Sequence, residues 1–145
     1  MTENTLPATT LRYLRELRTR MLHLHKILLE MERADFERVS GRLTGGEMLQ
    51  LVINHPQFAW LRQISALVVQ IDETLDADEP ATPGDLQSLL GQTRSLFTSA
   101  GDKTFRDKYQ TALQRNPEAV MAHSEVATLL RENEPHPSPA SQQDS

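Results

Sequence analysis

Residues 56–75, PQFAWLRQISALVVQIDETL, carry the strongest structural signal in this sequence. On a helix that turns by about 100° per residue, their apolar side chains cover more than half of the circumference. The continuous part of this arc is formed by Trp60, Leu61, Ile64, Leu67, Val68, Ile71 and Leu75, and Phe58 and Val69 extend it. A surface helix needs cover on one face only. We therefore interpret residues 56–75 as the central helix of a small bundle.

Start and stop signals divide the flanking sequence into further helices. Capping residues followed by Pro, Asp or Glu mark the starts, and Gly or a residue before Pro marks the ends. Thr9 or Thr10 is the expected first cap, Gly41 and Gly101 are expected stops, and the predicted helices span about 9–40, 44–54, 82–100, 102–114 and 116–132. The predicted fold is all-α, an up-and-down bundle of four main helices with two short connecting helices.

Length and composition narrow the class of protein. A chain of 145 residues suits one domain, which we expect at 9–133, between a flexible tail at 1–8 and a disordered tail at 134–145. A net charge of −5 and a pI near 5.5 argue against nucleic-acid binding. The absence of cysteine excludes disulfides and thiolate metal sites. No segment resembles a signal peptide or a membrane span, so we expect a cytoplasmic protein without membrane contact.

Several polar residues lie where a helical pattern calls for leucine. Arg18, His25 and Glu32 are seven residues apart, so they drift by only about 20° per step and stay within the apolar arc of their helix. Asp72 occupies a similar position on the 56–75 helix. His123 lies in the middle of the apolar face of the last helix. Three predicted helices therefore direct ionisable groups toward the interior.

Two interpretations follow from these residues. An unpaired polar group costs about 1–3 kcal/mol when it is buried, so these side chains should meet one another, a ligand or water. The structural interpretation, which we favour, is an internal network in which Arg18 or His25 faces Glu32 or Asp72. The functional interpretation is a pocket that binds a small polar molecule or a metal, lined by Arg18, His25, Glu32, Asp72 and His123.

Metal and catalytic signatures are weak. The sequence has neither the Glu-x-x-His pairs of di-iron bundles nor an H-E-x-x-H motif. His25 and Glu32 are about 10.5 Å apart along their helix, which is too far for easy shared coordination. A site made by His25, His123 and one carboxylate stays open, and the sequence identifies no cofactor. No residue is assigned a catalytic role, because Ser65 and Ser124 lack a nucleophile-elbow motif.

Three phrases, LHKILLEMERADFE (24–37), HPQFAWLRQISALVVQIDE (55–73) and RNPEAVMAHSEVATLL (115–130), resemble a family of small all-helical bacterial proteins with no assigned activity. The resemblance implies a helical fold and a bacterial origin, and it gives no residue a role. We expect a non-catalytic protein-interaction or self-associating module, since helix 9–40 is longer than a four-helix domain needs. Its partner would be a protein or a second copy. The alternative is a bundle, possibly an enzyme, that binds a small ligand or a metal.

Overall fold

A computed structural model describes residues 7–77, 82–98 and 102–132 of the chain. Within these ranges there are six α-helices, one 3₁₀-helix and no β-strand: α1 (Ala8–Ser40), α2 (Gly45–Asn54), η2 (Pro56–Leu61), α3 (Arg62–Asp76), α4 (Pro83–Thr98), α5 (Lys103–Arg115) and α6 (Pro117–Glu132). The all-α prediction is confirmed. The expected stop at Gly101 and nearly all of the two predicted tails lie outside the described residues.

Two capping boxes fix helix starts that the sequence predicts. The Thr44 hydroxyl accepts from the amide of Glu47 at 3.1 Å, and the Glu47 carboxylate accepts from the Thr44 amide at 2.9 Å. Thr82 and Asp85 exchange the same two bonds at the start of α4. Each box satisfies amides that a helix start leaves without a partner. These local bonds determine where α2 and α4 begin.

The observed end of α1 agrees with the prediction from the sequence, but its start does not. Gly41 ends the helix with φ at 90°, a conformation that glycine adopts without a Cβ clash, and its amide donates to the Glu37 carbonyl at 2.9 Å. At the other end, α1 begins at Ala8 after Pro7, and no side chain caps it. The predicted cap at Thr9 or Thr10 is therefore wrong. The fixed backbone of Pro7 precedes the helix in its place.

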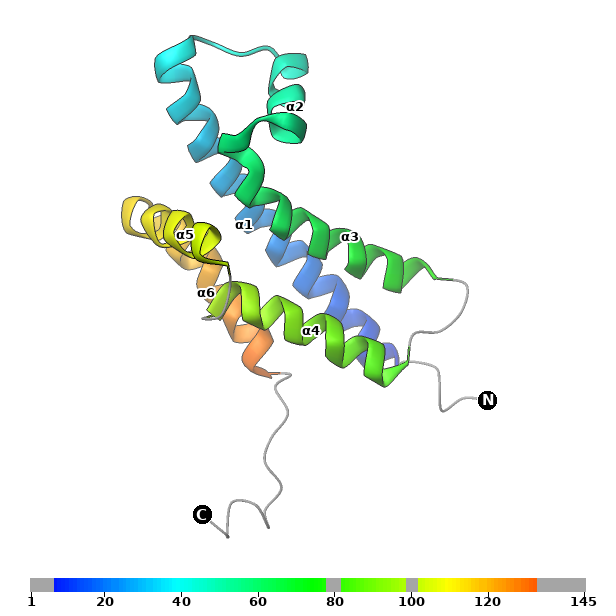
Figure 1. Cartoon of the computed structure of the whole chain (residues 1–145). Helices are drawn as coiled ribbons and strands as arrows, with labels where there is room; N and C mark the ends of the chain where they lie inside the picture. Colours follow the sequence, from blue (N-terminus) through cyan, green and yellow to red (C-terminus); the bar gives the residue numbers. More distant parts are fainter. Residues whose placement is uncertain (1–6, 78–81, 99–101, 133–145) are drawn as a thin grey trace.

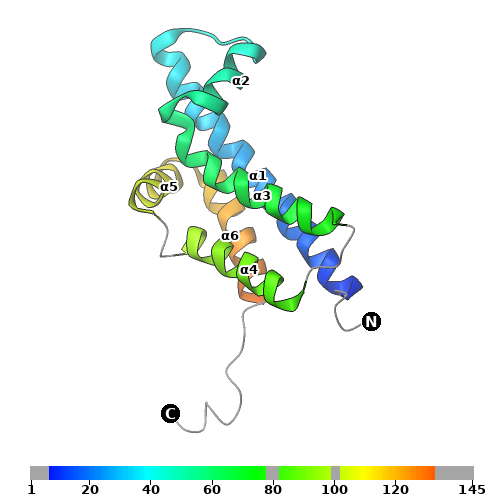
Figure 2. The same cartoon turned by 45° about the vertical axis from the view of Figure 1, so that its right-hand side comes forward.

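Four helices form the body of the molecule (Figure 1). α1 and α4 run in one direction and α3 and α6 in the other, as the second view also shows (Figure 2). α1 packs against α3 and α6, and α4 completes the ring between them. α5 lies against α6 and η2. The up-and-down arrangement of the four main helices is thus the predicted one.

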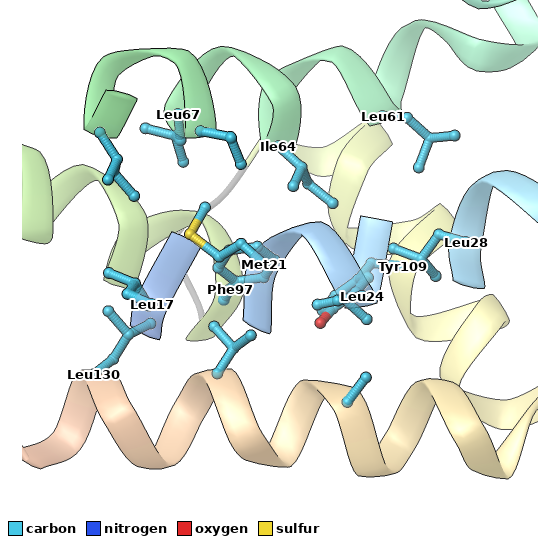
Figure 3. Packing of buried hydrophobic residues seen from close by; sticks show 14 of the residues in the cluster. Leu17, Met21, Leu24, Leu28, Leu61, Ile64, Leu67, Phe97, Tyr109 and Leu130 are labelled. Carbon is cyan, nitrogen blue, oxygen red and sulfur yellow. The ribbon is translucent and has the colours of Figure 1, made fainter. Parts of the chain in front are cut away.

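The core is built around one face of α1 (Figure 3). Leu17, Met21, Leu24 and Leu28 are fully buried and lie between α3 on one side and α6 on the other. A polar bond also joins α1 to α6, because the Tyr13 hydroxyl donates to the Leu129 carbonyl at 2.6 Å. Burial raises the pKa of Tyr13 to about 12. α1 and α6 are therefore held directly together.

The prediction of a single central helix at 56–75 needs correction. Residues 56–61 form the 3₁₀-helix η2, and α3 begins only at Arg62. Val69 is 51% exposed, and Ala66 and Glu73 on the same side are also exposed. α3 is therefore a peripheral helix of the bundle, with one face exposed to solvent. The 3₁₀ turn advances each residue by about 120°, so an angular plot that assumes one α-helix misplaces the residues on either side of Arg62 relative to each other.

A projecting segment, which we call the distal arm, consists of residues 37–56. It contains the last turn of α1, the loop from Gly41 to Thr44, helix α2 and the residues that lead into η2. Figure 1 shows it extending beyond the four-helix body. Among the described helices, none combines the length and the apolar character required to cross a membrane.

Candidate functional site

Two of the five predicted site residues form a pair between α1 and α3. The guanidinium of Arg18 donates to a carboxylate oxygen of Asp72. The two side chains are 39% and 38% exposed, so the pair lies at the outer edge of the contact between the two helices. Pairs this exposed contribute about 1 kcal/mol or less. This is one of the pairs that the structural interpretation names.

His25 lies seven residues further along α1 and is half-buried. Burial lowers the pKa of its imidazole. Since α1 and α3 are antiparallel and Arg18 pairs with Asp72, the register places Ser65 opposite His25. The Ser65 hydroxyl instead donates to the Arg62 carbonyl at 3.2 Å. No hydrogen bond to the His25 ring is formed within the described part of the chain.

His123 contacts a different helix. Its Nδ1 lies 2.7 Å from the hydroxyl of Tyr109 on α5, and the two ring centroids are 5.4 Å apart. Burial lowers the pKa of His123, with a smaller contribution from the charge of Arg131, and burial raises the pKa of Tyr109. When the imidazole is neutral with its proton on Nε2, its Nδ1 accepts a hydrogen bond from the Tyr109 hydroxyl. The pair joins α5 to α6.

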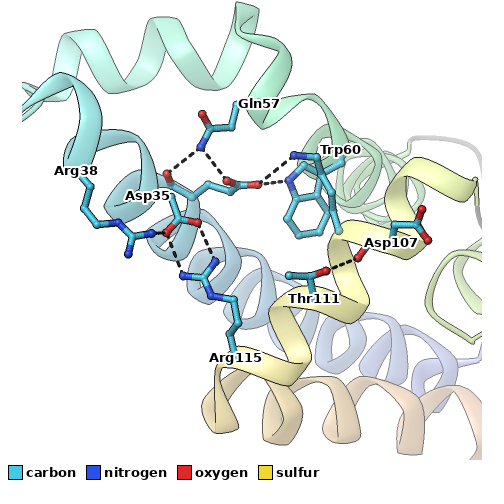
Figure 4. Close-up of polar contacts among 9 residues, drawn as sticks. Asp35, Arg38, Gln57, Trp60, Asp107, Thr111 and Arg115 are labelled. Atoms are coloured by element: carbon cyan, nitrogen blue, oxygen red, sulfur yellow. Dashed lines mark hydrogen bonds and ion pairs between the residues drawn. The ribbon is translucent and has the colours of Figure 1, made fainter.

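Glu32 lies in a polar cluster with Gln57 and Trp60, which are labelled in Figure 4. Trp60 Nε1 donates to Glu32 Oε2 at 2.5 Å, and Gln57 Nε2 donates to Oε1 at 3.0 Å. Lys108 Nζ on α5 lies 4.0 Å from Oε2. The Glu32 side chain is only 12% exposed. A carboxylate at this depth is tolerated because donors surround it.

Asp35 forms the second part of this cluster, one turn further along α1. Arg115 on α5 donates from both terminal nitrogens to the two Asp35 oxygens, at 2.9 and 3.0 Å, and Arg38 also contacts the carboxylate (Figure 4). The hydrogen bond from Arg115 is the main cause that lowers the pKa of Asp35. This two-point contact holds α5 against the C-terminal half of α1.

A pocket of about 240 Å³ opens between α1, η2 and α5. Leu28, Met31, Trp60 and Ala112 provide its apolar lining, and three acids and two bases surround it: Glu32, Asp35, Asp107, Lys108 and Arg115. Of the predicted site residues, only Glu32 lines this pocket. The described residues contain no group of three or more His, Asp or Glu side chains placed to hold a metal ion.

The predicted site residues thus belong to separate contacts. Arg18 forms a salt bridge with Asp72, Glu32 accepts a hydrogen bond from Trp60, and His123 is hydrogen-bonded to Tyr109. The ligand-binding role of this set stays a prediction. The residues that surround Glu32 were not predicted. Gln57, Trp60 and Lys108 contact Glu32 itself. Asp35 lies three positions further along the same helix and binds Arg115.

Comparison of the chain with protein-family models, curated proteins and solved structures finds no match. The resemblance to small bacterial helical proteins therefore stays a prediction.

Proposed function

We propose that this chain is a non-catalytic protein-interaction module whose docking surface is the outer face of α2. The observation that carries the proposal is the exposure of this helix. Five of its ten residues are large and apolar (Met48, Leu49, Leu51, Val52 and Ile53), yet none of its residues is buried. Each of the other described α-helices buries at least three residues.

The apolar residues of α2 occupy two faces. Met48, Leu51 and Val52 are partly buried and pack against the core. Leu49 and Ile53 lie one helical turn apart on the outer side, 57% and 52% exposed. A helix that is apolar on both sides is suited to lie between two partners. Among the described residues, α2 has packing partners on only one side.

Polar contacts between helices support a structural role for the body. Arg18, Glu32 and His123 each contact a side chain on a neighbouring element, and these contacts join α1 to α3, α1 to η2, and α6 to α5. Such cross-links fix the register of helices. A rigid body of this kind positions the distal arm for docking.

The first test compares two matched double variants. Leu49→Gln/Ile53→Gln changes the outer face, and Met48→Gln/Val52→Gln changes the inner face with the same spacing and a residue that favours helix. We expect the outer pair to change the free energy of unfolding by no more than about 0.5 kcal/mol. The inner pair should cost about 1–3 kcal/mol. Urea denaturation measures both, and equal destabilisation would contradict the proposal.

The second test looks for the contact itself. A photo-crosslinking amino acid is placed at position 49, or as a control at position 121 on α6, where Met121 is 68% exposed. Illumination of cells that naturally produce the chain should give a discrete protein adduct from position 49 and none from position 121. A chain that forms no adduct at position 49 is not an interaction module of the kind proposed.

The Glu32 pocket favours the second candidate function, binding of a small polar molecule. Its apolar lining and its mixed charges are features of ligand sites. Glu32 and Asp35 are, however, already engaged by neighbouring donors. Thermal-shift measurements with a metabolite collection decide this case: a ligand that raises the melting temperature of the wild-type chain but not of the Glu32→Gln variant supports binding in the pocket.

A further inference from the structure

We propose that the pocket between α1, η2 and α5 binds a small organic cation, an ammonium group carried by a compact apolar body, with the Glu32 carboxylate as its counter-ion. The inference goes beyond the interaction module. It rests on the second candidate function, because it names the chemical class of the ligand in that pocket. It is carried by the way in which the charged groups around the pocket are already paired.

Two of the three acids that line the pocket already have a cation at hydrogen-bond distance. Asp35 accepts from both terminal nitrogens of Arg115, at 2.9 and 3.0 Å. Asp107 accepts from Lys103 Nζ at 2.7 Å. The charge of each of these carboxylates is therefore balanced by a neighbouring side chain.

Glu32, the third acid, is bonded by neutral donors. Its oxygens accept from the Gln57 amide at 3.0 Å and from the Trp60 indole at 2.5 Å (Figure 4), and its side chain is only 12% exposed. Its ion pair within the described ranges is with Lys108, whose Nζ lies 4.0 Å from Oε2, beyond the usual length of a hydrogen bond. A carboxylate has about four acceptor positions, so Glu32 retains the capacity to accept from a cation.

The electrostatics of the pocket select a positive ligand. A largely buried carboxylate is costly when no cation is bonded to it, because burial removes the water that stabilises its charge. An ammonium group beside Glu32 would supply a charge-assisted hydrogen bond, which is about twice as strong as a neutral one. A carboxylate ligand would instead face three acids and two bases, and one of those bases, Arg115, is already bonded to Asp35.

The remaining lining fits a compact apolar body. Leu28, Met31, Trp60 and Ala112 provide apolar surface around a volume of about 240 Å³. This volume equals the share of about eight water molecules in the liquid, so the ligand has about that many non-hydrogen atoms. Benzylamine, an ammonium group on a single aromatic ring, meets both requirements. Benzyl alcohol and benzoate have a similar body and differ in charge.

The single tryptophan of the sequence provides the readout for a titration of the full chain. The indole N–H of Trp60 donates to Glu32, so a cation that binds this carboxylate shifts the indole resonance in NMR spectra. Benzylamine should give a saturable shift below about 20 mM, whereas benzyl alcohol, benzoate and sodium chloride should not. Glu32→Gln should abolish the saturable shift, and Glu30→Gln, at an exposed position on the same helix, should keep it.

Lys108 provides a test that leaves Glu32 in place. Its side chain is 41% exposed, so its ammonium group competes with the ligand for Glu32 from the solvent side. Lys108→Gln should therefore tighten benzylamine binding about fivefold, the effect of one unit charge at about 4 Å in water. Arg106→Gln removes the same charge from an exposed position of α5 outside the pocket lining and should leave the affinity unchanged. Weaker benzylamine binding by Lys108→Gln would contradict the inference.

The inference and the second candidate function fail in different ways. Absence of a saturable shift with benzylamine overturns the inference. Benzoate or benzyl alcohol that binds as tightly as benzylamine also overturns it, but retains a small-molecule pocket. If the metabolite collection gives no thermal shift either, the second candidate function fails as well. The interaction module is tested separately, by the adducts from position 49.

Discussion

Trp60 Nε1 donates to Glu32 Oε2 at 2.5 Å, and this hydrogen bond connects the C-terminal half of α1 to the 3₁₀-helix η2. Glu32 also accepts from Gln57, so each of its two oxygens has a donor. Gln57 also donates to the main-chain carbonyl of Glu32 at 3.4 Å. Among the described residues, the Trp60 N–H is therefore the donor that depends on this carboxylate.

Replacing Glu32 by Gln should lower the free energy of unfolding by about 1–3 kcal/mol. The amide presents one oxygen and one NH₂ group, so one of the two donors loses its acceptor. Fluorescence of the single tryptophan during urea denaturation reports the transition. Glu30→Gln, on the same helix with a 56% exposed side chain, is the control and should be nearly neutral. Equal effects would mean that the Trp60 bond contributes no stability.

Replacing Arg115 by Ala should cost about 0.5–1 kcal/mol, because the pair with Asp35 is partly exposed. Since Arg115 lowers the pKa of Asp35 below the usual 3.8, the stabilisation is present above that pH and is lost as the pH falls through the lowered value. The variant should therefore lose less stability than the wild type between about pH 4 and pH 2. Identical acid unfolding profiles would show that the pair is energetically silent.

His25 makes the stability sensitive to mild acid. Burial lowers its pKa below the usual 6.5, so the unfolded chain binds a proton more readily than the folded chain. Stability is complete above that pH and declines as the pH falls toward the lowered value. A His25→Gln variant should show a smaller decrease in melting temperature between pH 7.5 and pH 5.5. His23→Gln, an exposed position on the same helix, should behave like the wild type.

Thr44→Ala should destabilise α2 by about 1 kcal/mol, because it removes the side-chain acceptor of the capping box. The effect should be local: amide hydrogens of α2 exchange faster, while those of Leu17 and Leu24 in the core keep their protection. Thr44→Ser retains the hydroxyl and should restore slow exchange. Uniformly faster exchange throughout the bundle would show that α2 is an integral part of the core.

Local chemistry explains why the starts of α2, η2 and α4 were predictable. Capping boxes and proline act within four residues, so Thr44, Thr82 and Pro56 determine helix limits whatever the tertiary structure does. The heptad spacing likewise placed Arg18 and Asp72 on facing sides of α1 and α3. These inferences required only the geometry of a regular helix.

The cluster around Glu32 was beyond such reasoning. Its donors come from η2 and α5, and their positions depend on a 3₁₀ turn and on the way α5 packs across the bundle. A helical plot that assumed uniform geometry assigned Trp60 to an apolar arc only. The same plot could not show that one side of α3 is uncovered, because exposure of Val69 depends on which helices lie beside it.

The direct packing of α1 against α6 has a consequence for biosynthesis. The face of α1 that carries Leu17, Met21 and Leu24 is covered on one side by α6, which is translated after α2, α3, α4 and α5. A nascent chain that has emerged only as far as α5 exposes this apolar strip on the ribosome, where it is a target for chaperones. Closure of the bundle therefore waits until α6 has left the exit tunnel.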